Sequence, residues 1–181
     1  MNKLILSIVF LLLCYPAVMA QPADVQKTDA PISLRFEYED KCGSPLVESM
    51  IWSLVEGTVI KVVDGDTILM LTKENKRRRI DLAAVDASAA DDAARRMLNE
   101  LVLNRAVNVL VNPSNVKSKK VSGVVKTVGA DVNRALIQAG AARYKEPAPY
   151  SMSNHASCVY RITESEAREA KRGLWQTVVS R

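Results

Sequence analysis

The stretch from Gly57 to Asp86 constrains the fold of this chain more than any other, because turn signals divide it into three apolar runs. The dipeptide Asp64-Gly65 marks the first turn, and the charged residues 73–76 mark the second. This pattern predicts three strands joined as a meander. Because Asp66 closes the first turn and Asp86 ends the third predicted strand, we expect their carboxylates to meet at one end of the sheet, where hard cations such as calcium bind.

Residues 1–20 have the pattern of a secretory signal peptide, with a positive charge at Lys3, a short apolar run and small residues ahead of position 21. The apolar run is shorter than the ~20 residues that a membrane-spanning helix needs, and no later stretch is long enough. We therefore expect cleavage before Gln21, a periplasmic or secreted mature chain, and no membrane span after cleavage. A chain of 181 residues with 48% hydrophobic residues predicts one domain around a single core.

Two of the three cysteines, Cys42 and Cys158, lie beyond the predicted signal peptide. Compartments outside the cytosol permit disulfides, so we predict a bridge that ties the N-terminal extension to the segment before the last helix. A metal site at these cysteines is poorly supported, since neither has a second Cys or a His at ligand spacing. We interpret His155, the only histidine, as a surface loop residue.

The segments ahead of the meander differ in pattern. Residues 21–31 are polar and aperiodic, which predicts a flexible leader. Residues 32–39 alternate strictly between apolar and polar positions, as a half-buried strand does, whereas residues 46–55 fit either a helix or a strand. We assign residues 32–55 to an N-terminal extension with one extra strand and residues 56–181 to the main domain.

Helical and strand patterns alternate after the meander. We expect a helix over residues 89–103, followed by strands over 106–111 and 121–128. A second helix should be capped by Asp131 and stop near Gly140. After a loop over 147–157, a last helix should begin with a capping box at Thr163 and end at Gly173. Five strands with about three helices follow the order of an OB-type β-barrel. The predicted fold class is therefore α+β.

Four short motifs carry a resemblance to a known family. They are Val63-Asp64-Gly65-Asp66-Thr67, Val85-Asp86-Ala87, Asp131-Val132-Asn133 with Ala135-Leu136, and Gly173-Leu174-Trp175. In order and spacing they resemble the thermonuclease (staphylococcal nuclease-like) family over residues 56–176. The resemblance implies an OB-fold with a calcium-dependent phosphodiesterase site, in which Asp66 and Asp86 hold the metal and Ala87 contributes a backbone carbonyl.

Three positions depart from the pattern of that family. Asp81 stands where the resemblance implies a phosphate-binding arginine, and Ala89 stands where it implies a glutamate base. Lys120 stands in place of a second arginine. It keeps the positive charge, but a lysine cannot make the planar bidentate grip of an arginine. No catalytic residue is therefore assigned.

Two classes of function follow. The first is a thermonuclease-like domain with lost or much reduced phosphodiesterase activity that binds nucleic acid or a protein; the second is an active calcium-dependent endonuclease with a rearranged site. An envelope assembly or secretion component that uses residues 32–39 as an interface is a further alternative. Basic side chains that could contact phosphates are Lys73, Lys76, Arg77, Arg79, Lys117, Lys119 and Lys120. A solvated charged hairpin would show the same pattern.

Overall fold

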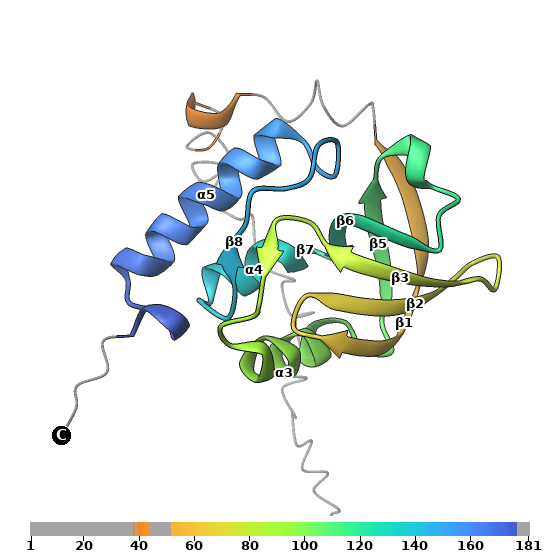
Figure 1. Cartoon of the computed structure of the whole chain (residues 1–181), viewed down its shortest axis with the longest axis horizontal. Coiled ribbons are helices and arrows are strands. Elements are labelled where there is room, and N and C mark those ends of the chain that lie inside the picture. The colour runs from red at the N-terminus through yellow and green to blue at the C-terminus, as the bar shows by residue number, and fades with distance from the viewer. Residues whose placement is uncertain (1–37, 39, 44–51, 177–181) are drawn as a thin grey trace, which may run out of the picture. The chain divides into compact units, whose positions relative to one another are not determined.

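Five strands close into a β-barrel in the computed structural model of this chain (Figure 1). The structure describes Tyr38, residues 40–43 and residues 52–176. The expected signal peptide and leader, residues 1–31, lie outside the described residues. No helix among the described residues has the length and apolar character to cross a membrane.

The barrel is built from the predicted meander and two later strands. Its strands are β1 (Ser53–Asp64), β2 (Thr67–Thr72), β3 (Arg77–Leu82), β5 (Ala106–Val111) and β6 (Lys120–Thr127). They follow the order β3-β2-β1-β5-β6 through antiparallel pairs, and a parallel pairing between β3 and β6 closes the barrel. The short strand β7 (Ala130–Asp131) adds to the outer side of β6. The OB-type α+β prediction is confirmed.

Strand β1 pairs with two neighbouring strands. Its first half pairs with β5 and its second half pairs with β2. The pairing with β2 contains two irregularities, between Val59 and Lys61 and between Val62 and Asp64. Bulges of this kind bend a strand and shift the alternation of its side chains. As a result Val59 and Val62, at an odd spacing, are both buried in the core. β1 starts at Ser53, so the end of the ambiguous segment 46–55 is strand, while residues 44–51 lie outside the described residues.

The third strand of the meander ends earlier than predicted. β3 stops at Leu82, and Asp86 lies in a separate two-residue strand, β4 (Val85–Asp86), which pairs with β8 (Arg143–Tyr144). Between them Ala84 has a positive φ of 60°, a conformation that interrupts a strand. The run of apolar residues hid this turn, because alanines carry no turn signal.

Three α-helices lie within residues 52–176, namely α3 (Asp91–Val102), α4 (Val132–Gln138) and α5 (Asn154–Glu169). α3 buries Ala94, Leu98 and Val102, one residue per turn on a single face, and packs on β1. Asp131 caps α4 by accepting a hydrogen bond from the Arg134 N–H at 3.0 Å. The first two predicted helices are therefore confirmed. The 3₁₀ turns η1 (Pro113–Asn115) and η2 (Gly173–Trp175) complete the described elements.

The predicted start of the last helix is wrong. α5 begins at Asn154, and Ser153 caps it by accepting a bond from the Ala156 N–H at 3.1 Å. Thr163 is fully buried inside the helix, where its hydroxyl donates to the carbonyl of Val159 at 2.9 Å. Polar residues near Thr163 gave a capping-box pattern, although they occupy helix positions. His155 therefore lies in the first helical turn and not in a loop, with Nδ1 2.6 Å from the carbonyl oxygen of Gly43.

The described part of the N-terminal extension is held against α5. Cys42 and Cys158 form a disulfide with a Cα–Cα distance of 5.6 Å, as predicted, although Cys158 lies within α5 and not ahead of it. Of the strand predicted over residues 32–39, only Tyr38 is described, and it is helical, as are residues 40–42. The Tyr38 hydroxyl donates to Glu166 at 3.0 Å and accepts from Arg134 at 2.9 Å.

Two glycines let the end of α4 touch the chain after α5. Gly140 has φ +66°, and a Cβ there would lie 2.1 Å from the carbonyl oxygen of Arg172. Gly173 has φ +49°, and its Cβ would lie 2.3 Å from the carbonyl oxygen of Gly140. The N–H of Leu174 donates to that same Gly140 oxygen at 2.8 Å. Only glycine permits this approach, which joins α4 to η2.

Asp131 gives a pH prediction. Burial raises the pKa of this carboxyl above its ordinary value of 3.8, although the Arg134 N–H and the Tyr160 hydroxyl donate to it. A raised folded-state pKa means that ionisation costs stability as the pH rises above 3.8. Asp131→Asn keeps a capping oxygen. We expect this variant to gain stability over the parent at neutral pH and to lose that gain below pH ~3.

Thermal melts across pH check this expectation. Asp131→Ala is the control, because it removes the cap and should cost about 1 kcal/mol. A parent and an Asn variant that differ by the same amount at every pH would contradict the expectation.

Candidate functional site

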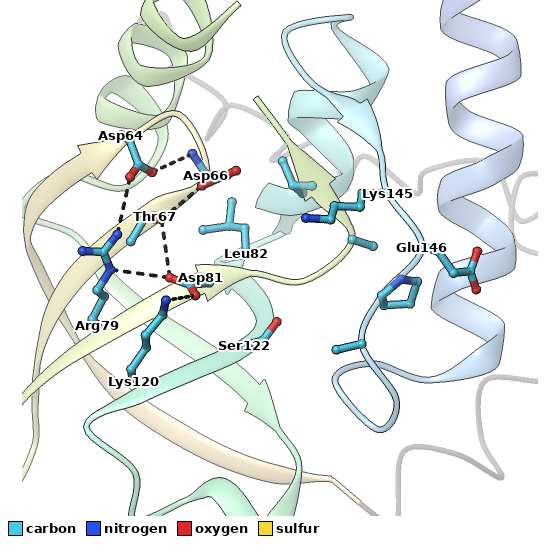
Figure 2. A pocket seen from close by; sticks show the side chains of 14 residues that line it. Asp64, Asp66, Thr67, Arg79, Asp81, Leu82, Lys120, Ser122, Lys145 and Glu146 are labelled. Atoms are coloured by element: carbon cyan, nitrogen blue, oxygen red, sulfur yellow. Dashed lines mark hydrogen bonds and ion pairs between the residues drawn. The ribbon is translucent and has the colours of Figure 1, made fainter. Parts of the chain in front are cut away.

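A polar pocket of about 450 Å³ opens where the first turn of the meander meets β3, β6 and the chain after β8 (Figure 2). We call it the site pocket. It is lined by Asp64, Asp66, Thr67, Arg79, Asp81, Leu82, Ala84, Val85, Lys120, Ser122, Lys145, Glu146, Pro147 and Ala148. Four carboxylates and three cationic side chains thus face one cavity.

The first turn reaches the pocket because Gly65 allows a close approach. A Cβ at Gly65 would lie 2.6 Å from the Cβ of Ala87 and 2.8 Å from that of Ala94. The Gly65 N–H donates to the Asp91 carboxylate at the start of α3 at 2.6 Å. The turn is therefore pressed against α3, and Asp64 and Asp66 project from its two ends.

The carboxylate of Asp66 lies in a partly buried and partly paired position. The Thr67 hydroxyl donates to it at 3.1 Å and lies 3.5 Å from Asp81 (Figure 2). Burial raises the pKa of Asp66, a shared hydrogen bond with Asp64 raises it further, and bonds from Thr67 and the Ala87 N–H oppose the rise. Two neighbouring carboxylates repel each other, and a bound cation would reduce that repulsion.

Asp81 lies between two cations. Its carboxylate is 3.0 Å from Nζ of Lys120 and 3.6 Å from Nε of Arg79, and the Arg79 guanidinium is also 3.6 Å from Asp64. The parallel register of β3 and β6 causes this arrangement, because Arg79 lies opposite Lys120 and Asp81 opposite Ser122. Residues two apart on a strand share a face, so Arg79 and Asp81 point the same way. The Arg79 guanidinium therefore lines the pocket beside Asp81.

Lys145 and Glu146, two charged residues of the site pocket, were not indicated by the sequence patterns. β8 pairs with β4, and the Lys145 N–H donates to the carbonyl of Ala84 at 3.0 Å, which brings Lys145 and Glu146 to the pocket. The Lys145 side chain points toward the first turn, whereas Glu146 accepts a bond from the Tyr144 hydroxyl at 2.8 Å. A two-residue strand leaves no periodicity in the sequence, so no signal marked Lys145.

Asp91 and Asp92 are the acidic residues that follow position 89 in the sequence. Asp91 accepts the Gly65 N–H, and Asp92 forms an ion pair with Arg95 at 3.1 Å. Neither lines the site pocket, and Ala89 is exposed. Both carboxylates lie in the first turn of α3, where the helix dipole favours negative charge.

The side chains predicted to contact nucleic acid fall into three places. Lys73 forms an exposed ion pair with Glu56. Arg79 and Lys120 line the site pocket. The other four line a second cavity of about 460 Å³, which we call the basic pocket and which consists of Lys76, Arg77, Arg78, Lys117, Ser118 and Lys119.

Comparison with known proteins identifies the family. Residues 73–177, more than half of the chain, match the family described as staphylococcal nuclease homologue. The chain belongs to this family. A protein of Escherichia coli O157:H7 named as an uncharacterized endonuclease is 30% identical over 125 residues, which cover 67% of this chain and 77% of the relative. An uncharacterized endonuclease of Haemophilus influenzae is 27% identical over 121 residues, which cover 65% of this chain and 64% of the relative.

Membership of the staphylococcal nuclease family raises the question of calcium, because the family depends on calcium in general. Among the residues that the structure describes, no three His, Cys, Asp or Glu side chains group as metal ligands. Asp86 accepts the Ser88 N–H at 3.0 Å and does not line the site pocket, and the Ala87 carbonyl accepts the Ala90 N–H at 2.9 Å. Calcium takes six to eight oxygens. Asp66 and Asp86 would thus supply only part of the oxygens that calcium takes, and we derive no step through a metal.

The electrostatics of Asp86 separate it from Asp66. Hydrogen bonds from Ser88 hold the pKa of Asp86 below its ordinary value, and the charges of Lys145 and Arg143 act in the same direction. Asp66 has a raised pKa instead. The two carboxylates predicted as one metal pair thus lie in different environments, and their role in binding calcium stays a prediction.

Proposed function

We propose that this domain binds nucleic acid with a phosphodiester group at the site pocket and cleaves it slowly or not at all. The observation that carries the proposal is the Asp81 carboxylate held between Arg79 and Lys120. A phosphate has to displace Asp81 before either cation can contact it. Family membership and the endonuclease names of the relatives support nucleic acid as the ligand.

The charges of the site pocket explain why cleavage is weak. Phosphoryl-transfer sites stabilise the charge that develops in the transition state with preorganised cations, and removal of one such contact typically costs ~100-fold or more. Here Asp81 occupies the position of an arginine and neutralises its neighbours. Position 89 carries no carboxylate to accept a proton, which typically costs another ~100-fold or more.

An active endonuclease with a rearranged site is the second candidate. It is favoured by the three cations Arg79, Lys120 and Lys145, which all line the site pocket. The ion pairs of Arg79 and Lys120 are partly exposed, with 34% of the Asp81 side chain accessible, so they are weak enough for a substrate to replace.

We further propose that the domain functions in the periplasm or outside the cell. The Cys42–Cys158 disulfide supports this proposal, because such bonds persist in oxidising compartments. The signal-peptide pattern of residues 1–20 supports it as well. Cell fractionation of a tagged full chain tests it, and recovery of the protein in the cytosolic fraction with reduced thiols would contradict it.

A binding and cleavage experiment tests the main proposal. We expect the chain to bind a labelled oligonucleotide with an affinity that falls as salt rises, and to cut plasmid DNA in calcium at a rate near background. Lys120→Ala should weaken binding about tenfold, because it removes a phosphate contact. The control Lys61→Ala removes an exposed lysine that lines neither pocket.

Two outcomes would contradict the proposal. Absence of any oligonucleotide binding would remove nucleic acid as the ligand. Efficient calcium-dependent cutting that Asp66→Ala abolishes would instead establish the active endonuclease. Calorimetry with calcium on the same samples reports whether Asp66 and Asp86 bind the ion, since either alanine variant should then abolish the heat.

A further inference from the structure

The basic pocket gathers five cationic side chains from two segments that are distant in sequence. Lys76 lies in the turn between β2 and β3, Arg77 and Arg78 begin β3, and Lys117 and Lys119 come from the loop between η1 and β6. Ser118 is the sixth lining residue, so no carboxylate lines this cavity. The two segments meet because β3 and β6 pair in parallel and the Arg79 N–H donates to the Lys119 carbonyl at 2.9 Å.

Arg78 holds the hairpin and the loop together. Its guanidinium donates to the backbone carbonyl of Val116, and its side chain is partly buried. The cations are therefore brought together by a specific contact, whereas a solvated hairpin would spread its charges apart. Glu74 is an acid near this pocket. A hydrogen bond with the Thr72 side chain lowers its pKa, and the charges of Lys76 and Arg78 act in the same direction. Glu74 is exposed and is not part of the lining.

Like charges that line one cavity repel one another, and a polyanion removes that repulsion. The site pocket has the opposite character, since its lining has four carboxylates against three cations. Its own charges therefore do not attract a phosphate backbone. If nucleic acid reaches the site pocket, most of the attraction has to come from a second surface.

The two pockets lie along one seam. Arg77 lines the basic pocket, and Arg79 and Asp81, on the same face of β3, line the site pocket. Arg77 and Asp81 are four positions apart along the strand, a distance of roughly 13 Å. At the start of β6, Lys119 lines the basic pocket and the next residue, Lys120, lines the site pocket. A single nucleic-acid strand laid along this seam would pass from one pocket to the other.

We propose that the basic pocket is a phosphate-binding anchor for a single strand of nucleic acid, which it holds while the strand extends along β3 and β6 into the site pocket. This proposal rests on the proposed function for its ligand. It adds that Lys76, Arg77, Lys117 and Lys119 supply most of the affinity, and that Arg78 positions them. The anchor binds the backbone and not the bases, so it is independent of sequence.

Oligonucleotide length and salt dependence test the anchor in the full chain, with a chelator present so that nothing is cut. The probes are thymidine oligonucleotides of about 12 and about 4 nucleotides, within the range of site sizes for OB folds. We expect the double variant Lys76→Ala with Lys119→Ala to bind the longer probe at least about tenfold more weakly. The slope of the logarithm of its binding constant against the logarithm of the salt concentration should become shallower by about 1.4. Each lost phosphate contact on a single strand removes ~0.7 from this slope.

The matched control is Lys61→Ala with Lys126→Ala, two exposed lysines that line neither pocket. This control should keep the affinity and slope of the parent. The preference of the parent for the longer probe should disappear in the Lys76/Lys119 variant, because only a long strand spans both pockets. Melting temperature checks that each variant is folded.

The outcomes separate the anchor from the proposed function. If Lys76→Ala with Lys119→Ala binds like the parent while Lys120→Ala binds weakly, the anchor is wrong and the proposed function stands. If the Lys76/Lys119 variant loses binding and Lys120→Ala does not, the anchor stands and the site pocket is not where phosphate binds. If the parent binds neither probe, both fail.

Discussion

The triple variant Asp81→Arg, Ala89→Glu and Lys120→Arg is expected to cut plasmid DNA in calcium at least about 100-fold faster than the parent. Asp81→Arg removes the carboxylate that pairs with both Arg79 and Lys120 and adds a guanidinium, whose fork can grip a phosphate bidentately. Ala89→Glu adds a proton acceptor at an exposed position. The fold should tolerate these changes, because partly exposed ion pairs are worth only ~0–1 kcal/mol.

Two controls make this result specific. Asp92→Arg makes the same change of charge as Asp81→Arg, but on the surface of α3, where Asp92 pairs with Arg95, and it should leave the rate at the level of the parent. Asp66→Ala added to the triple variant should abolish the gain. If the parent already cuts DNA efficiently and Asp66→Ala abolishes this cutting, the proposal of reduced activity is wrong. The chain is then an active endonuclease with a rearranged site.

Loss of the Cys42–Cys158 disulfide is expected to lower the free energy of unfolding by about 3–5 kcal/mol. The two cysteines are 116 residues apart, so the bridge closes a loop that includes all five barrel strands and restricts the unfolded chain strongly. Urea unfolding of Cys42→Ser with Cys158→Ser against the parent measures the difference. A melting temperature lower by roughly 6–20 °C should accompany it.

Reductant provides the matched comparison for the disulfide. It should lower the stability of the parent to that of the double serine variant and leave that variant unchanged. Intact mass after alkylation without reductant reports whether the thiols are free. Two alkylated cysteines in protein from an oxidising compartment would show that the bond does not form, and equal stability with and without reductant would show that it contributes little.

Local sequence patterns predicted the barrel well. β5 and β6 were predicted within a residue because alternation of apolar side chains is a strong signal over six or more positions. The short strands β4 and β8 were not, since two residues carry no period. The start of α5 was lost for a different reason. Several polar residues in this chain can cap a helix, and only tertiary burial shows that Thr163 lies inside one.

The sequence indicated some residues of the candidate site but not how their side chains are arranged. The family motif drew attention to Asp66, Asp81 and Lys120, and these three line one pocket because their strands pair in the barrel. It did not show that Asp81 lies between Arg79 and Lys120, since that depends on how long side chains bend over the β3–β6 register. Lys145 was missed for a different reason, because the pairing of β8 with β4, and not a sequence motif, brings it to the pocket.

The contact between Gly140 and the chain at Gly173 has a consequence for proteolysis. Leu174 supplies the donor for the Gly140 carbonyl, and Trp175 lies beneath the guanidinium of Arg168 at 4.2 Å. The last barrel strand, β6, ends at Thr127, so the barrel itself does not contain this contact. A chain cut ahead of Gly173 would keep every barrel strand but would lose the segment that joins α4 to the chain after α5. Such cleavage is therefore expected to loosen the helices α4 and α5 before it affects the barrel.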